Sequence, residues 1–311
     1  MPKVVKITRD TPATWQEALQ QFLWWKQAQG ISATTLGDYR QHITRFFNRY
    51  PTAYSQTGLK PCVLEYMAQP VKPATFNLRL VYLKAFFDWC VHEGIFFENP
   101  LEGFKQRKAD ARIIDIDTEV LKKLLEIPDQ TTFAGLRDYA LLVLELDTGI
   151  RPKEALQLLI SDFDFRNLEV TVRAEISKTR TARTLPLMPQ TCEAVRKLIS
   201  ARHPSWKDDV PVFCSSEGTM MSRFTWRDRL KMYGQKLGVK LTPYSLRHLY
   251  AINYLRNGGY ELGLMRTMGH TTLSMTKRYV NFSNEDLHRM NSAVSPINAL
   301  LPRKNHRKRK V

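Results

Sequence analysis

Hydrophobic positions recur at helical spacing through the first hundred residues of the chain. Thr14 and Glu17 have the spacing of a helix capping box, and Gly30 is a suitable helix stop. We therefore expect residues 12 to about 103 to be all-helical, with a second helix near 34–48, a short third near 62–68 and a fourth from Pro73 to about Gly94. The aromatic residues on these helices keep the helical period, which favours a packed core over base-stacking platforms.

The pattern changes near the middle of the chain. After expected helices at 117–127 and 133–147, Leu168, Val170, Val172 and Ala174 alternate with polar residues, which indicates a strand. A basic turn at 177–180 and a second strand at 183–187 complete a hairpin. Helical spacing then returns, at about 189–202, 223–236, 243–257, 260–267 and 272–280. The predicted fold class is mainly α with a small β-hairpin or sheet.

Composition and polarity divide the chain into four parts. Residues 1–104 form a helical domain, 105–112 a polar linker, 113–302 a mixed domain and 303–311 a basic tail. The four cysteines are far apart and suggest neither a zinc site nor a disulfide framework. No apolar run has the length of a membrane span and the N-terminus carries no export signal, so we expect a cytoplasmic protein with no membrane partner.

Charge gives the strongest hint of a partner. The formal net charge is +17, and the excess is +5 in residues 1–110, +6 in 111–302 and +6 in the last nine residues. A basic surface of this kind favours a polyanion such as nucleic acid, although a solvated basic surface without a partner is the plain alternative. The basic residues considered for DNA contact are Arg40, Arg45, Arg79, Lys84 and Arg180.

Three polar segments lie where helices are expected to begin. Arg151 precedes a helix that starts at Pro152, Arg247 follows the helix start at Thr242-Pro243, and His270 precedes a helix expected to carry Tyr279 in its second turn. Each segment alone could be an ordinary capped turn, and a lone tyrosine or histidine is usually structural.

Together, the three segments suit phosphoryl transfer without a metal or other cofactor. The arginines can bind non-bridging phosphate oxygens, and Glu154 can orient Arg151. Lys178, on the hairpin turn, can protonate a leaving oxygen. Tyr279 can attack phosphorus and store the bond energy as an ester. The sequence shows no carboxylate cluster of the kind that a magnesium nuclease uses.

With these residues in this order, the chain resembles the tyrosine recombinases, also called phage integrases. The resemblance covers 12–103, with an ending of the type G-I…N-P-L, and 113–295, where TGIRPKEAL, ISKTRTARTLPL, TPYSLRHLYA and MGHTTLSMTKRYV follow in the family's order. It implies a DNA-binding core domain, a catalytic domain and a site-specific recombinase that forms a 3′-phosphotyrosyl intermediate. By resemblance the catalytic residues are Arg151, Lys178, Arg247, His270 and Tyr279, with Glu154 in support.

One position departs from the family pattern. Tyr244 stands where the family usually has histidine, and a phenol is a poorer proton acceptor at neutral pH than an imidazole. Phosphate binding by Tyr244 is therefore expected, but not general-base work. His248, one step beyond Arg247, is expected to point elsewhere and not to substitute.

The resemblance also implies an assembly. Double-stranded DNA is the expected partner, with four copies in the synaptic complex and a monomer or weak oligomer when free. Three rivals remain: a catalytically silent DNA-binding protein of the same fold, a type IB topoisomerase, and an RNA-binding or scaffold protein. Integration or excision of a mobile element and resolution of chromosome dimers are both open as biological roles.

Overall fold

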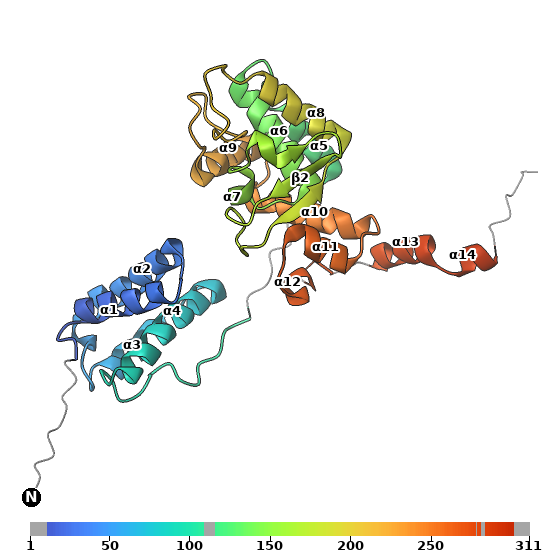
Figure 1. Ribbon diagram of the computed structural model, residues 1–311. Coiled ribbons are helices and arrows are strands. Elements are labelled where there is room, and N and C mark those ends of the chain that lie inside the picture. The colour runs from blue at the N-terminus through green and yellow to red at the C-terminus, as the bar shows by residue number, and fades with distance from the viewer. Residues whose placement is uncertain (1–10, 109–115, 278, 281–283, 302–311) are drawn as a thin grey trace, which may run out of the picture. The chain divides into compact units, whose positions relative to one another are not determined.

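The computed structural model describes residues 11–108, 116–277, 279–280 and 284–301 (Figure 1). The chain folds into two compact units, Met1–Asp110 and Ala111–Val311, and each is described by itself. The second half of the expected linker, 109–112, and the whole basic tail lie outside the described residues. Within those residues, no helix is long and apolar enough to cross a bilayer.

The first unit is a bundle of helices around an aromatic core. Its helices are α1 (Trp15–Ala28), α2 (Ala33–Arg49), α3 (Leu59–Ala68) and α4 (Pro73–His92), with a short 3-10 turn at Pro51–Ala53. The Thr14 side chain accepts a hydrogen bond from the backbone of Glu17, which confirms the predicted cap. The core aromatics are buried, as the sequence predicted, and meet mostly edge to face; they include Phe22, Phe46, Phe47, Phe86 and Phe87.

The second unit places helices around a small sheet. α6 (Phe133–Thr148) packs against α8 (Pro189–Ser200) and α10 (Pro243–Arg256). The remaining helices are α5 (Thr118–Glu126), α7 (Pro152–Ala155), α9 (Arg223–Lys236), α11 (Glu261–Met268), α12 (Leu273–Lys277), α13 (Asn284–Val294) and α14 (Ile297–Leu300).

The sheet has three antiparallel strands in the order β1 (Phe163–Asp164), β2 (Glu169–Val172) and β3 (Arg183–Pro186). Val170 pairs with Phe163 on one side and with Leu185 on the other, and it is fully buried. The predicted hairpin is confirmed as β2–β3. The sequence missed β1, since two residues are too short to show an alternating pattern.

One helix ends earlier than the sequence suggested. A helix was expected over 272–280, but α12 ends at Lys277. Tyr279 therefore lies in the turn after the helix and not in its second turn. Its ring packs against a small apolar cluster of Ala251, Leu255, Leu264 and Met268.

Candidate active site and nucleic-acid interface

The candidate active site begins where α6 ends. Gly149 closes this helix with φ +60°, a left-handed conformation that glycine adopts without a Cβ penalty. A Cβ on Gly149 would also lie 2.2 Å from Cδ1 of Tyr250. Two residues later Arg151 caps α7 and Pro152 takes its first position, as predicted. The tight turn between two helices thus fixes where the Arg151 side chain starts.

A single carboxylate joins two arginines. Glu154 is buried, and its Oε1 accepts from Arg151 Nη1 at 2.9 Å while its Oε2 accepts from Arg183 Nη2. Burial alone would raise the pKa of Glu154, but the ion pairs with Arg183 and Arg151 outweigh burial and hold that pKa below its usual value. Glu154 is therefore a charged anchor, as expected for a residue that orients a guanidinium.

Arg247, on the first turns of α10, is bonded by two of its nitrogens. Its Nη1 donates to the Gly149 carbonyl, and its Nη2 donates to the Met268 carbonyl at 2.7 Å. Burial, and next the charge of Arg151, lower the pKa of Arg247 to about 10, so it still carries its charge at neutral pH.

The last carbonyls of α11 accept hydrogen bonds from Arg151, Arg183 and Arg247. Thr267 O accepts from Arg183 Nε at 3.1 Å, and Gly269 O accepts from Arg151 Nη2 at 2.7 Å; Met268 O accepts from Arg247. The final carbonyls of a helix have no partner inside it and carry partial negative charge. The end of α11 therefore holds three cations close together, two of which also pair with the carboxylate of Glu154.

His270 follows this helix end directly. Its Nε2 lies 3.2 Å from Arg247 Nη2, and its Nδ1 lies 2.9 Å from Thr276 Oγ1. Since an arginine can only donate, Nε2 is the acceptor and Nδ1 carries the hydrogen. The imidazole is thereby oriented beside Arg247, where the sequence predicted a phosphate-supporting group.

Tyr279 lies next to two histidines, His270 and His248. Its ring stacks on that of His270 with 6.5 Å between centroids and 10° between planes. Its hydroxyl is 2.8 Å from Nδ1 of His248, on α10. The expectation that His248 points elsewhere is therefore wrong, because the turn after α12 carries the Tyr279 hydroxyl to the side of α10 that His248 occupies.

The hairpin turn brings Lys178 to the edge of this cluster. Its backbone nitrogen donates to Glu154 Oε1 at 3.3 Å, and its side chain is exposed. Arg180, two residues on, is also exposed and has φ +53°, so the turn is tight. The structure thus ties the turn to Glu154 and leaves the lysine ammonium on the surface.

Tyr244 is placed differently from Arg247. The Tyr244 side chain is 59% exposed whereas Arg247 is 4% exposed, so the two face solvent and interior respectively. A shared role at one phosphate stays a prediction for this pair. The sequence missed Arg183 as well as His248. Arg183 was noted only as the start of a strand, although an arginine at the first position of β3 is a cation directed into the domain.

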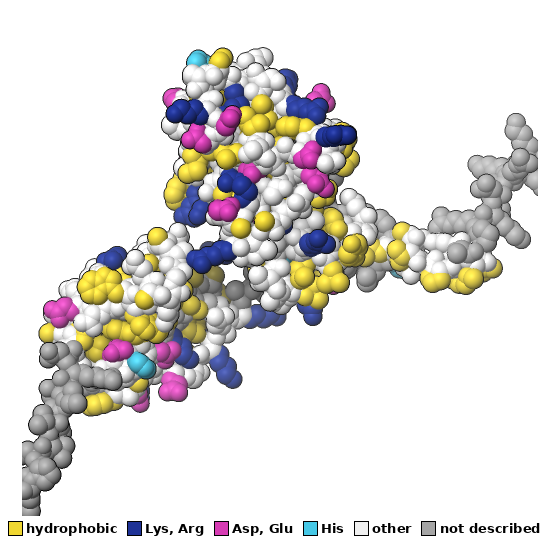
Figure 2. Space-filling model, in the orientation of Figure 1, with side chains coloured by type: hydrophobic (Ala, Val, Ile, Leu, Met, Phe, Trp, Pro, Cys, Tyr) yellow, Lys and Arg dark blue, Asp and Glu magenta, His cyan; other side chains and the backbone are white. Residues whose placement is uncertain are grey.

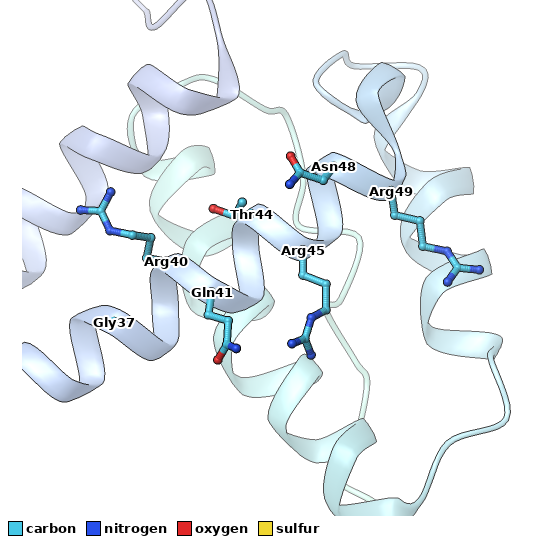
Figure 3. Close-up of a pocket in the computed structure, with 7 residues that line it drawn as sticks. All are labelled: Gly37, Arg40, Gln41, Thr44, Arg45, Asn48 and Arg49. Atoms are coloured by element: carbon cyan, nitrogen blue, oxygen red, sulfur yellow. The ribbon is translucent and has the colours of Figure 1, made fainter.

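A second basic surface lies on α2 in the first unit. Arg40, Arg45 and Arg49 are exposed there and line a shallow pocket (Figure 3). Its other lining residues are Gly37, Gln41, Thr44 and Asn48. The side chains project from successive turns of one helix, which suits contact with a run of phosphates.

Two other candidates for DNA contact, both on α4, are less available than those on α2. Arg79 Nη1 donates to the Tyr66 carbonyl at 2.7 Å and to Gln69 Oε1 at 3.1 Å, and its guanidinium lies over the Tyr66 ring. Lys84 is partly buried. Arg79 therefore has a role within the unit, and any DNA contact by these two residues stays a prediction.

The model of the phage integrase family matches residues 115–286. The chain belongs to the phage integrase family. It is 25% identical over 300 residues to tyrosine recombinase XerC of Proteus mirabilis, covering 92% of this chain and 96% of that one. It is 30% identical over 227 residues to XerC of Salmonella typhi, covering 72% and 74%. The chain is accordingly a tyrosine recombinase, a site-specific DNA recombinase.

Solved structures show the same fold at lower identity. The structure of XerH bound to a palindromic difH substrate is similar with a TM-score of 0.70 and 18% identity, over 92% of this chain and 85% of that one. The Tn1549 transposon integrase in complex with circular intermediate DNA is similar with a TM-score of 0.69 and 18% identity, over 89% and 98%. The mainly helical fold with a small sheet is confirmed by these likenesses.

Proposed function

We propose that this recombinase cleaves and rejoins double-stranded DNA through Tyr279. The observation that carries the proposal is the cluster at the end of α11. Arg151, Arg183 and Arg247 all donate to its last carbonyls, two of them also pair with Glu154, and the Tyr279 ring stacks on the adjacent His270. Three guanidinium groups with one carboxylate leave a site of positive charge, which suits a phosphodiester.

The proposed cleavage step is an in-line displacement at phosphorus. The Tyr279 oxygen forms a bond to phosphorus while the bond from phosphorus to the 5′ oxygen breaks. The product is a 3′-phosphotyrosyl ester that conserves the bond energy for rejoining. The 5′ oxygen takes its proton from the Lys178 ammonium, which is exposed at the hairpin turn.

Arg151 and Arg247 stabilise the charge that develops on the phosphate oxygens, and His270 supports them by accepting a hydrogen bond from Arg247. Their side chains are fixed before DNA arrives, through Glu154, the end of α11 and Thr276. Donors held in place need little rearrangement during the reaction, and each is worth about 10²–10³ in rate. This pre-organisation is the reason to assign Arg151 and Arg247 to transition-state stabilisation, with His270 in support.

DNA binding by the remainder of the chain follows from charge. We assign residues 1–104 to a DNA-binding domain and 113–302 to the catalytic domain. The α2 surface of Arg40, Arg45 and Arg49 contacts backbone phosphates. In the second unit, we assign a separate phosphate contact to Arg180 at the hairpin turn, near Lys178. We also assign the protein to the cytoplasm, as expected from the sequence.

Assembly into a tetramer would use the C-terminal helices. Val294, Ile297, Leu300 and Leu301 are all more than half exposed, and Figure 2 shows apolar side chains on this segment. Exposed apolar side chains that lie close together along a segment favour docking on another protein surface. We assign them to a neighbouring copy in the synaptic complex, with a monomer or weak oligomer when no DNA is bound.

Covalent trapping tests this function. The protein is incubated with nicked suicide duplexes that carry DNA from beside its own gene, and denaturing gels are searched for a protein–DNA adduct. We expect an adduct with the parent and none with Tyr279→Phe. Tight binding of the same duplexes without an adduct would instead favour a catalytically silent DNA-binding protein.

A further inference from the structure

The Tyr279 hydroxyl has a hydrogen-bond partner that the catalytic set above does not include. His248 Nδ1 lies 2.8 Å from this oxygen, and the two rings are 5.4 Å apart with 49° between their planes. This is a normal distance for an O–H···N hydrogen bond. The contact joins the nucleophile to α10, the helix that also carries Arg247.

The other polar groups near the site are engaged differently. Both nitrogens of His270 are within hydrogen-bond distance of Arg247 and Thr276. Glu154 is held by two arginines and has a pKa below its usual value, so it is a weak proton acceptor. The Tyr244 side chain is mostly exposed, and a neutral phenol is a poor base. Among the described residues, His248 thus touches the reacting hydroxyl and has the chemistry of a base.

We propose that His248 is a catalytic residue that accepts the proton of Tyr279 during cleavage. This inference rests on the proposed role of Tyr279 as nucleophile. As the tyrosine oxygen bonds to phosphorus, its proton passes to Nδ1 of His248 and the imidazole becomes imidazolium. The 5′ oxygen leaves with a proton from Lys178, so one proton moves within the protein, from Tyr279 to His248, and one passes from Lys178 to the DNA. Rejoining runs the same transfers in reverse.

The position of His248 in the sequence fits this role. Arg247 and His248 are consecutive residues of one helix, so a phosphate ligand and a proton acceptor are held at a fixed separation. Arg247 is buried, whereas His248 is partly exposed on the neighbouring side of the helix, where the Tyr279 hydroxyl lies. A phosphate bound beside Arg247 would therefore face a Tyr279 hydroxyl that is already hydrogen-bonded to its proton acceptor, His248.

The test compares His248→Asn with His248→Ala in single-turnover cleavage of the nicked duplexes. An asparagine amide oxygen can take the place of Nδ1 and accept the tyrosine hydrogen bond, but it cannot accept the proton. If His248 is a base, both variants form adduct more slowly by about a hundredfold or more. If it only positions Tyr279, His248→Asn cleaves at the parent rate, and the proposal is overturned.

Two further measurements separate the causes of a slow reaction. Thermal unfolding and duplex binding by His248→Asn should match the parent, since neither depends on proton transfer. Added imidazole should restore adduct formation to His248→Ala, because the cavity left by the ring can take the free base. The Tyr279→Phe control distinguishes the two proposals. An adduct that still forms in that variant would overturn the proposal that Tyr279 is the nucleophile. Parent-like cleavage by His248→Asn would overturn only the proposal that His248 is the base.

Discussion

At the scale of single residues, the candidate site depends on how arginine forms hydrogen bonds. Arg247 donates from two nitrogens to carbonyls of different helices, those of Gly149 and Met268. A lysine ammonium is a point charge and cannot reproduce this planar fork. Tyr244, by contrast, is exposed and contributes no bond that fixes the cluster. We therefore expect substitutions at Arg247 to be much more damaging than substitutions at Tyr244, although both lie on α10.

The first prediction follows from that difference. Tyr244→His should retain cleavage near the parent level, because an imidazole at this exposed position can still donate to a phosphate oxygen. Arg247→Ala should reduce the rate of adduct formation by at least about 10²-fold, since it removes a fixed cationic donor. Quantifying adducts on the suicide duplexes checks both variants. An equal loss in the two would contradict the assignment.

The second prediction concerns Glu154 and its charge. Glu154→Gln leaves Arg151 and Arg183 without their buried carboxylate, so we expect a loss of about 3 kcal/mol in unfolding free energy at pH 7. The pKa of Glu154 is lowered in the folded protein, so its contribution is present above the unfolded-state pKa and is lost as pH falls through the folded one. The difference in unfolding free energy between Glu154→Gln and the parent should therefore become smaller below about pH 4.

Urea unfolding at pH 7 and at pH 3.5 measures this gap. Arg227 and Asp228 form an exposed ion pair with no role in the site, and Asp228→Asn is the matched control. The control should change stability little at either pH, because exposed pairs contribute little. A Glu154→Gln penalty that is the same at both pH values would show that shape, and not charge, is what the residue supplies.

At the scale of elements, the sequence predicted those whose ends carry local signals. Thr242 and Pro243 begin α10, and Gly149 ends α6, as their residue types require. The early end of α12 was not predictable, because nothing between Thr272 and Val280 is a helix breaker and the packing of Tyr279 on α10 and α11 decides it. His248 was missed for the same reason: its partner arrives from another element.

The third prediction uses two glycines that end helices. Gly149 and Gly238 both have positive φ, but a Cβ at Gly149 would overlap Tyr250 whereas one at Gly238 would meet nothing within 4 Å. Gly238→Ala should cost about 1 kcal/mol of stability from backbone strain alone. Gly149→Ala should cost about 2–4 kcal/mol, because a ring must also move.

Cleavage assays give the functional half of this prediction. The Gly149 carbonyl accepts from Arg247, so a shift of this turn displaces the guanidinium that we propose binds the phosphate. We expect Gly149→Ala to form less adduct even at a temperature where it is fully folded, and Gly238→Ala to match the parent. Combining Gly149→Ala with Tyr250→Ala should recover part of the activity if the ring is the obstacle. No recovery would attribute the defect to the backbone conformation.

At the scale of the whole molecule, positive charge extends over both units, whereas the candidate active site lies in the second. The excess is +5 in residues 1–110 and +6 in 111–302. The sequence predicted a polyanionic partner from this distribution, but it did not show which cations are free to bind. Arg79 was equivalent to Arg40 in the sequence, and only the structure shows the Arg79 guanidinium bonded to Tyr66 and Gln69.

The last prediction tests whether the α2 surface binds phosphates. Each phosphate neutralised by a side chain contributes about 0.9 to the slope of log affinity against log salt. Arg40→Ala with Arg45→Ala should therefore make the slope shallower by about 1.8 and weaken binding at low salt. Lys60→Ala with Lys105→Ala removes the same charge from exposed positions outside α2, and should leave the slope near the parent value. Equal changes in both pairs would mean that net charge alone, and not the α2 surface, attracts DNA.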